Sequence, residues 1–391
     1  MEKKPAYLWT TDDRIEMAAK KKWYKFEYQY TRYNPQLGSY TAKSTVIAKT
    51  EKEAEKFAKM SCDKAIYGSN SFDCILSKSE PLELGKDFEL EIAYKHDRYV
   101  FNEKLGKLLN TKTYMSIVST NKCNRNCAYC INSKTDCKSD LPFDKAIENI
   151  TKAKKEFGIK ECVILGGEPT LYKKLTQPIE YLRFKLNFEK VVMTTNGIAL
   201  TDSLLEDICS SGLTHLNVSI HNNKDFIPLK RMKQIYAIAN AYGVMVRVNT
   251  NVWRGNHDTV KSLVRWLKKF QNCSDSIRVS NIIVKDGFSV NPENNEETYK
   301  MKMSDEEYNK LFDGLIEYYS KKMSCINNPT ALGFVDYTMI PTKSVIIVNR
   351  NIDSKVAEQI CENEESKVNT IKCLVSGSLS LSWNEGNKIE L

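Results

Sequence analysis

The stretch ECVILGGEPT, residues 161–170, is a short apolar run followed at once by a polar, glycine-rich turn. A run of this kind is typical of a buried strand in a parallel sheet. An amphipathic helix is expected just before it, over residues 143–157, and Gly158 ends this helix. One face of the helix carries Phe143, Ala146, Ile147, Ile150, Ala153 and Phe157. Helix and strand together form one unit of an α/β fold.

The same unit recurs through the middle of the chain. Helical patterns, two of them ended by Gly212 and Gly243, separate the apolar runs. The runs expected as strands are YMSIVST (114–120), ECVIL (161–165), KVVMTT (190–195), HLNVSIH (215–221), VMVRVNT (244–250) and SIRVSNIIV (276–284). Six such repeats predict an α/β fold with a parallel sheet, either wrapped into a barrel or left open. In both arrangements ligands bind at the carboxyl ends of the strands.

The segments that flank these repeats read differently. Two alternating, aromatic-rich runs at 22–33 and 39–50 predict a hairpin, which a helix (51–66) and a strand (71–79) follow. Beyond the repeats we expect a helix over 304–323 and strands in SVIIVNRN (344–351) and SLSLSW (378–383). The expected domains are a small β-β-α-β module (1–85), a linker and lead-in (86–111), the core (112–290) and a C-terminal α+β extension that caps the core (291–391).

Composition describes an ordinary globular protein of 391 residues, with 41% hydrophobic and 27% charged residues. No apolar run approaches the roughly 20 residues of a membrane helix, so no membrane association is expected. The first residues, MEKKPAYLWTTDDR, lack the apolar centre of a secretory signal, which predicts a cytoplasmic protein. The net charge of +9 permits an acidic partner, but a solvated basic surface is the simpler interpretation.

Three of the twelve cysteines lie together in CNRNCAYC, at Cys123, Cys127 and Cys130. In a reducing cytosol such a group indicates metal or redox chemistry rather than disulfides. Three thiolates are one fewer than a structural zinc ion requires, and Cys137 is the alternative fourth ligand. The other cysteines are scattered and are expected to act mainly as small buried hydrophobic residues.

A polar or glycine-rich motif ends each of the first five predicted strands. The cysteine segment follows the first strand, and the fifth strand carries Arg247 and Asn249. The second, third and fourth strands end in GGEPT (166–170), TTNG (194–197) and SIHNN (219–223). Because the carboxyl ends of parallel strands meet at one edge, these motifs are expected to converge on a single ligand.

The CxxxCxxC pattern of CNRNCAYC, together with GGEP, resembles the radical S-adenosylmethionine (radical SAM) enzymes over about residues 115–285. The resemblance implies a partial (β/α)6 TIM-type barrel and one [4Fe-4S] cluster held by the three cysteines. S-adenosylmethionine (SAM) would occupy the remaining iron and be cleaved reductively to a 5′-deoxyadenosyl radical, which abstracts hydrogen from the substrate. A flavodoxin- or ferredoxin-type protein would donate the electron.

The resemblance also implies roles for individual residues at the strand ends. Tyr129 would lie beside adenine, and Glu168 would accept a charge-assisted hydrogen bond from the methionine ammonium group. Gly166 and Gly167 would let the backbone approach SAM. The other positions implied to bind the cofactor are Thr195, Asn196, Ser219, Arg247 and Asn249.

Simpler interpretations apply to several of these residues. Thr195 and Ser219 can act only as hydrogen-bonding residues at strand ends. His221 can contact substrate, but a lone histidine there is more often a packing residue. Candidate hydrogen donors or substrate contacts, chosen by chemistry alone, are Cys209, Cys325, Tyr337 and His221. The hairpin tyrosines Tyr24, Tyr28, Tyr30, Tyr33 and Tyr40 form either a binding surface or cross-strand pairs.

Two substrate classes and one non-catalytic alternative follow, in order of preference. The first is a peptide or protein side chain, with the exposed edge of the N-terminal hairpin holding a peptide by strand addition. The second is a nucleotide or nucleic-acid base, which the basic charge and the aromatic hairpin favour. The third is a non-catalytic iron–sulfur or zinc protein, which would have no use for GGEP. A second cluster is not expected, because the last hundred residues contain no CxxC pair.

Overall fold

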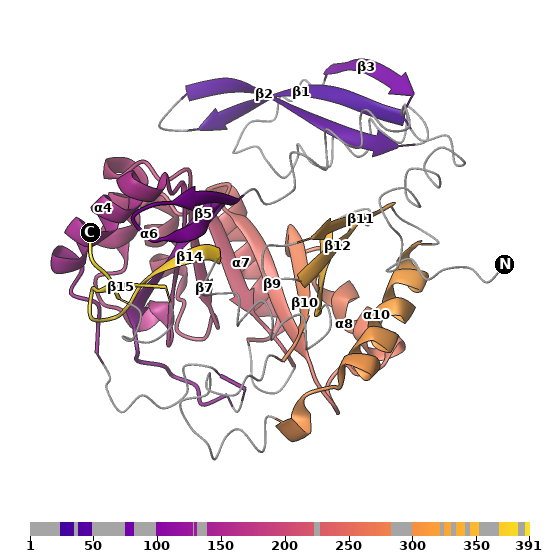
Figure 1. Ribbon diagram of the computed structural model, residues 1–391. Coiled ribbons are helices and arrows are strands. Elements are labelled where there is room, and N and C mark those ends of the chain that lie inside the picture. The colour runs from indigo at the N-terminus through magenta and orange to yellow at the C-terminus, as the bar shows by residue number, and fades with distance from the viewer. Residues whose placement is uncertain are drawn as a thin grey trace.

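Figure 1 shows the computed structural model of the chain. The structure describes residues 24–34, 38–48, 75–81, 99–127, 129–130, 139–222, 227–282, 299–320, 324–329, 334–340, 345–351, 367–381 and 388–391. Near the N-terminus, three antiparallel strands form a small sheet in the order β2-β1-β3. These strands are β1 (Tyr24–Asn34), β2 (Gly38–Ala48) and β3 (Ile75–Pro81). The predicted hairpin and third strand are therefore confirmed, whereas the helix predicted over 51–66 lies outside the described residues.

The register of this hairpin bears on its tyrosines. Tyr28 is opposite Ser44, Tyr30 is opposite Ala42, and Tyr40 is opposite Arg32. None of the tyrosines is thus directly opposite another across β1 and β2.

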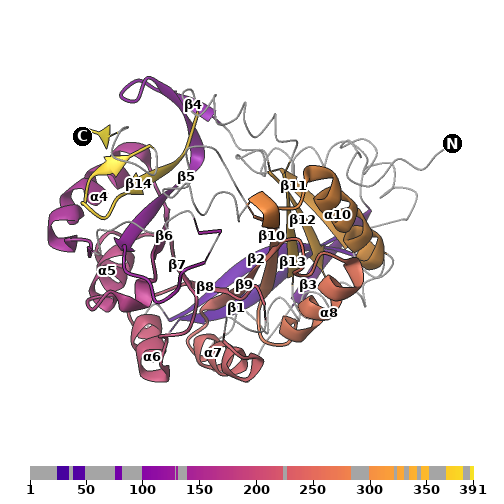
Figure 2. The ribbon, with the colours of Figure 1, turned by 90° about the horizontal axis from the view of Figure 1, so that it is seen from below.

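Six parallel strands form the centre of the main sheet, and neighbours along the chain are neighbours in the sheet. They are β5 (Lys107–Thr120), β6 (Glu161–Gly166), β7 (Lys190–Thr195), β8 (His215–Ser219), β9 (Met245–Val252) and β10 (Ser276–Asn281). In Figure 2 the strands form an open arc with helices on its outer side. All six predicted strands and the partial, unclosed (β/α)6 barrel are confirmed.

The helices between these strands begin and end where local signals place them. α4 ends at Gly158, whose φ of 62° suits a residue without a Cβ, and its buried side chains include Ile150 and Phe157. The side chain of Thr201 caps α6, and Thr259 and Ser262 form a capping box at α8. The helices are α4 (Phe143–Phe157), α5 (Thr176–Glu180), α6 (Asp202–Ser210), α7 (Leu229–Ala241) and α8 (Val260–Phe270).

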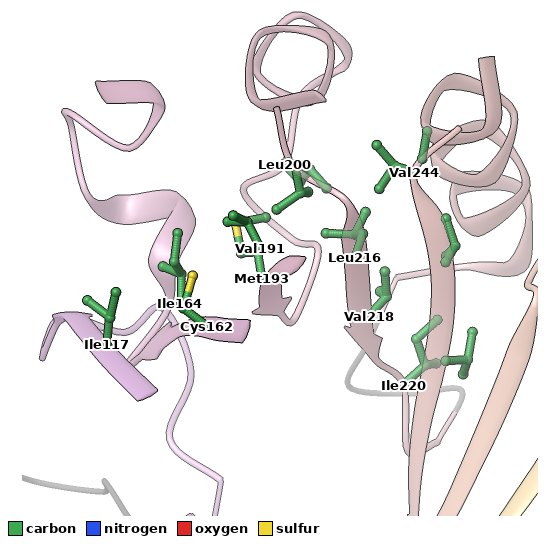
Figure 3. Packing of buried hydrophobic residues seen from close by; sticks show 14 of the residues in the cluster. Ile117, Cys162, Ile164, Val191, Met193, Leu200, Leu216, Val218, Ile220 and Val244 are labelled. Atoms are coloured by element: carbon green, nitrogen blue, oxygen red, sulfur yellow. The ribbon is translucent and has the colours of Figure 1, made fainter. Parts of the chain in front are cut away.

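The two faces of the arc differ in chemistry, most clearly at β9. Its outer face is apolar and packs against the helices, as Figure 3 shows for side chains such as Cys162, Val191 and Leu216. Successive residues of a strand point to opposite faces, so the residues between them line the concave side. In β9, for example, Val246 and Val248 are buried, whereas Arg247 and Asn249 alternate with them and are only half-buried. On β9 the concave side is therefore polar where the outer side is apolar, whereas Val118, Val163 and Val192 lie on the concave side of β5, β6 and β7.

The C-terminal segment extends the main sheet at both ends of the arc. β13 (Val345–Asn351) pairs in parallel with β10, and β14 (Lys367–Cys373) pairs in parallel with β5. The remaining elements are α10 (Asp305–Ser320), β11 (Ser324–Pro329), β12 (Phe334–Ile340), β15 (Leu379–Ser380) and β16 (Lys388–Ile389). The predicted helix and both predicted strand segments are thus present, and the strands widen the sheet.

The lead-in to the core contains structure that sequence patterns had not indicated. β4 (Tyr99–Asn102) pairs antiparallel with the start of β5, so β5 begins at Lys107, well before the predicted Tyr114. The turn between them is closed by the side chain of Asn102, which accepts from the amide of Leu105 (3.0 Å). In the described part of the chain, no helix has the length and apolarity to cross a bilayer.

Candidate active site

Residues 121–139, hereafter the cysteine loop, follow β5. Backbone hydrogen bonds close the base of this loop. The amide of Asn121 donates to the carbonyl of Ser139, and that of Leu141 donates to Ser119, both at 2.9 Å. Lys122 and Asp140 form an ion pair there (2.7 Å). Burial alone would raise the pKa of Asp140, but hydrogen bonds from Lys122 and Thr120 outweigh it and lower that pKa. The loop therefore leaves the sheet edge from a fixed base.

The three cysteines lie in the first half of this loop, before residue 131. Cys123 is exposed, Cys127 and Cys130 are half-buried, and the amide of Cys130 donates to the carbonyl of Cys127 (3.0 Å). Partial burial raises the pKa of the Cys123 thiol, and the negative charges of Glu168 and Cys127 add to this. The amide and guanidinium of Arg125 act in the opposite direction. The predicted cysteine and GGEP motifs are therefore neighbours in space.

The two glycines of GGEP touch the cysteine loop directly. The amide of Gly167 donates to the carbonyl of Thr120, and the amide of Glu168 donates to that of Lys122, both at 2.7 Å. A Cβ on Gly166 would lie 2.3 Å from the Thr120 carbonyl oxygen, and one on Gly167 would lie 2.2 Å from that of Lys122. These contacts explain the glycines by the approach of two backbones, a reason that differs from the expected approach to SAM.

The carboxylate of Glu168 is buried, with 1% of the residue exposed. Among the described residues, its Oε1 accepts three hydrogen bonds: from the amide and hydroxyl of Thr170 and from the hydroxyl of Thr195. Its Oε2 accepts from the amide of Asn196 at 2.7 Å. Oε2 therefore retains more acceptor capacity than Oε1, and it is the atom suited to receive an ammonium group.

Thr195 and Asn196 organise this region through protein contacts. Thr195 also accepts from the amide of Gly197 (3.0 Å), so its hydroxyl is engaged on both sides and positions Glu168. The amide group of Asn196 donates to the side chain of Asn124 in the cysteine loop (2.7 Å). The end of β7 is thereby joined both to Glu168 of the GGEP turn and to the cysteine loop.

Polar side chains line the concave face of β7, β8, β9 and β10. Asn217 is opposite Arg247, and Ser219 is opposite Asn249. Arg247 donates from Nε to the side chain of Asn249 at 3.0 Å. Arg278 of β10 is opposite Asn249, and its Nε is buried without a hydrogen-bond partner among the described residues. Two guanidinium groups thus lie on neighbouring strands of one face.

Three rings from different strand ends meet beside the cysteine loop. The ring centroids of Tyr129 and Trp253 are 5.3 Å apart, and those of Tyr129 and His221 are 5.4 Å apart. His221 is buried, and burial together with the charge of Arg125 lowers its pKa to about 3. Its Nδ1 accepts from the amide of Asn251 (2.9 Å), so the neutral ring carries its proton on Nε2. His221 therefore lies at the site as a neutral, oriented ring.

The remaining candidates are a cysteine of the core, two residues of the C-terminal strands, and Cys137. Cys209 packs in the core between α6 and the sheet, where burial raises its pKa to about 12, so its candidacy as a hydrogen donor at the strand ends was wrong on position. Cys325 lies in β11 and Tyr337 in β12, at the end of the main sheet beyond β13. Cys137 lies outside the described residues.

Sequence reasoning missed Trp253 and Arg278. Arg278 had a signal, because SIRVSN repeats the Arg-Val pair of VRVNT in the neighbouring strand and so places a second arginine on the same face. Trp253 had none, because its contact with Tyr129 joins two loops that are distant in the sequence.

Residues 117–301 match the family model described as the radical SAM superfamily. This part of the chain is a radical SAM domain, as the cysteine and GGEP motifs predicted. A [4Fe-4S] cluster and SAM are the cofactors of the superfamily and hence of this chain.

Two curated relatives carry the same kind of core. The probable GTP 3′,8-cyclase of Methanocaldococcus jannaschii is 34% identical over 119 residues, which cover 30% of this chain and 38% of the relative. The GTP 3′,8-cyclase of Clostridium perfringens (strain SM101) is 30% identical over 176 residues, which cover 41% of this chain and 53% of the relative. The chain thus matches about half the length of these relatives or less.

Solved structures show the same fold. Streptococcus suis SuiB bound to its precursor peptide SuiA aligns with a TM-score of 0.53 at 15% identity, over 92% of this chain and 84% of that one. SuiB bound to SAM aligns with a TM-score of 0.51 at 15% identity, over 72% and 63% of the two chains. At such identities the likeness concerns the fold alone.

The residues at the site fit these cofactors. In a cubane cluster each thiolate binds a separate iron, and Cys123, Cys127 and Cys130 supply three such thiols on one short segment. The buried Glu168 carboxylate, with acceptor capacity on Oε2, fits the ammonium group of SAM.

Proposed function

We propose that this chain is a radical SAM enzyme whose substrate is an anionic nucleotide. Cys123, Cys127 and Cys130 would hold the cluster, and Glu168 would orient the amino group of SAM through Oε2. When bound, these cofactors supply one-electron reductive cleavage of the C5′–S bond and, through it, abstraction of a hydrogen atom from the substrate. Since Cys123 is exposed, a flavodoxin- or ferredoxin-type donor would have access to this part of the surface.

The arrangement of Arg247 and Arg278 carries the choice of substrate class. Both side chains lie on the concave face, beside Asn249, and the Nε of Arg278 has no partner among the described residues. A phosphate group can accept several hydrogen bonds from two guanidinium groups at once, whereas an uncharged side chain would leave a buried donor unsatisfied. Arg247 would be shared with the carboxylate of SAM, and Arg278 would contact the nucleotide.

The curated relatives favour the same class, because their names specify a cyclase acting on GTP. The sequence alone had ranked a peptide side chain first, so the order of the two hypotheses is reversed. GTP itself is therefore the first nucleotide to test.

A peptide remains the second candidate for one reason. The likeness to SuiB with its precursor peptide extends over 92% of this chain, well beyond the region shared with the GTP 3′,8-cyclases. In that case the small sheet β1–β3 would hold the peptide by strand addition.

The test is cluster-dependent cleavage of SAM. Protein reconstituted with iron and sulfide without oxygen, and then reduced with dithionite, should convert SAM to 5′-deoxyadenosine. Nucleoside triphosphates, nucleosides and a peptide library are added in parallel, and formation of 5′-deoxyadenosine is measured by chromatography. Transfer of deuterium from a deuterated nucleotide would support the proposal. Stimulation by peptides alone would select the second candidate, and an intact cluster without any 5′-deoxyadenosine would contradict both.

A further inference from the structure

A tight turn at residues 253–256, hereafter the Trp253 turn, follows β9 at the carboxyl edge of the sheet. The amide of Asn256 donates to the carbonyl of Trp253 (2.8 Å), and the amide of Trp253 donates back at 3.3 Å. Gly255 has a φ of +83°, which a side chain would oppose. The side chain of Asn256 donates to the carbonyl of His221 (2.9 Å). The turn is therefore fixed to the ends of both β8 and β9.

The indole of Trp253 packs against Tyr129 of the cysteine loop. Their ring planes are inclined by 36°, and His221 meets the Tyr129 ring nearly edge-on, at 78°. His221 and Trp253 also contact each other, with 6.4 Å between centroids. Two rings from the ends of β8 and β9 thus limit how the tyrosine ring can turn.

An ion pair joins the Trp253 turn to α10. Arg254 donates to both carboxylate oxygens of Glu307, with the shortest contact 2.7 Å from Nη2 to Oε2. Glu307 is itself fixed, because it forms a capping box with Ser304: the amide of Ser304 donates to Oε2 (2.7 Å), and the amide of Glu307 donates to the serine hydroxyl (3.1 Å). α10 begins at Asp305, beyond the region that matches the superfamily model.

We propose that Trp253 is a positioning residue for SAM, which holds the Tyr129 ring at the adenine side of the cofactor site. The Arg254–Glu307 ion pair fixes Trp253 in turn, so the C-terminal segment contributes to SAM affinity without touching SAM. A ring that is already held loses less rotational freedom when the ligand binds. The inference rests on the proposed function in one respect, since it takes SAM as the ligand beside the cysteine loop.

The test compares ligands that contain different parts of SAM. Equilibrium dialysis with reconstituted protein measures the Kd of SAM, of 5′-deoxyadenosine, which has only the adenine side, and of methionine, which has only the iron-binding side. Trp253→Ala should weaken SAM and 5′-deoxyadenosine about tenfold, and Trp253→Phe should restore most of that loss. Glu307→Gln keeps the capping box and should weaken both about two- to fivefold. Methionine should bind all variants equally.

Lys104→Gln is the matched control, because it removes an exposed ion pair with Glu156 (3.1 Å) far along the chain from the Trp253 turn. It should leave all three Kd values as in the wild type. If Trp253→Ala binds SAM as tightly as the wild type does, at equal iron content, the inference is overturned. The same holds if Trp253→Ala weakens methionine binding as much as it weakens SAM binding. If Trp253→Ala does not retain the cluster, the Glu307→Gln variant decides: an unchanged Kd for SAM in that variant contradicts the inference. Wild-type protein that binds no SAM would instead contradict the proposed function.

Discussion

The backbone amide of Glu168 donates a hydrogen bond to the carbonyl oxygen of Lys122, 2.7 Å away. This bond joins the turn that presents the acidic side chain to the loop that presents the cysteines. Together with the bond from Gly167 to Thr120, it fixes the main chain of Glu168 beside the cysteine loop, while Thr170, Thr195 and Asn196 orient the carboxylate. The two halves of the cofactor site are thus joined by two backbone hydrogen bonds.

Replacing Gly167 by alanine should disrupt this contact. The new methyl group would lie 2.2 Å from the Lys122 carbonyl oxygen, so the loop must move away. We expect Gly167→Ala to reduce the iron and sulfide bound after reconstitution by at least about half, as measured by chemical analysis and by absorbance near 400 nm. Gly106→Ala is the control, because nothing lies within 4 Å of its Cβ position; it should cost about 1 kcal/mol through backbone strain and keep the cluster.

The hydroxyl of Thr195 should matter for the orientation of Glu168 rather than for the fold as a whole. Thr195→Val removes one of the hydrogen bonds to a buried carboxylate, which should lower the free energy of unfolding by about 1–3 kcal/mol and weaken SAM binding. Thr195→Ser keeps the hydroxyl and should retain most of both. Urea unfolding and equilibrium dialysis measure the two effects. A valine variant that binds SAM as tightly as the serine variant would argue against this role.

Arg278 should contribute to nucleotide affinity. Arg278→Gln removes a charge-assisted contact, so we expect the KM of the nucleotide to rise about 10- to 100-fold. Lys160→Gln is the control for the loss of one positive charge, since Lys160 pairs with Glu189 in an exposed position between α4 and β6. Similar KM values in the arginine and lysine variants would show that Arg278 does not contact the substrate.

Stability should decrease in mildly acidic solution because of His257. Burial lowers its pKa from 6.5 to about 4, so the unfolded chain binds a proton more readily than the folded protein does. The stabilisation is complete above about pH 6.5 and is lost as the pH falls toward 4. We expect the free energy of unfolding to be lower at pH 5 than at pH 7.5, with about 1 kcal/mol of the difference due to this residue.

The His257→Asn variant isolates that contribution. Asparagine tolerates the left-handed φ of 58° at this position and does not titrate. Urea unfolding of both proteins at the two pH values gives the comparison. If the variant shows the same dependence on pH as the wild type, the assignment to His257 fails.

The cysteines whose side chains the structure describes should separate into two groups by reactivity. Burial raises the pKa of the Cys162, Cys209 and Cys373 thiols, with values of about 12 for the last two, so they should resist alkylation in the folded protein. Cys123, Cys127 and Cys130 are exposed or half-buried and should react first in cluster-free protein. Mass spectrometry after brief iodoacetamide treatment measures this order, and a bound cluster should protect the three loop residues. Rapid labelling of Cys162 would contradict the described core.

The central sheet could be predicted from the sequence because the helix side of each strand is buried and so requires an apolar residue at every second position, as in β9. The start of β5 was missed, since the pairing of β4 with its first residues depends on an Asn102 turn that resembles a linker. The two ends of the sheet were also not predictable, because parallel pairing of β13 and β14 depends on partners that are distant in the chain.

At the site, motif spacing identified the residues but not the direction in which each side chain points. Thr194 and Thr195 are adjacent, yet Thr194 receives a hydrogen bond from Asn217 on the concave side, whereas Thr195 donates to Glu168. Successive strand residues point to opposite faces. An error of one position in the predicted strand therefore assigns a side chain to the wrong face of the sheet. The glycines of GGEP were likewise identified by pattern, while their reason, a close backbone contact, required the structure.

The addition of β13 and β14 to opposite flanks of the arc has a practical consequence for dissecting the protein. A truncation after residue 301, where the family match ends, would strip hydrogen-bonding neighbours from β10 and from the Tyr114–Ile117 stretch of β5. Unpaired strand edges of that kind recruit strands from other molecules and lead to aggregation. The smallest soluble catalytic fragment should therefore retain the C-terminal ninety residues.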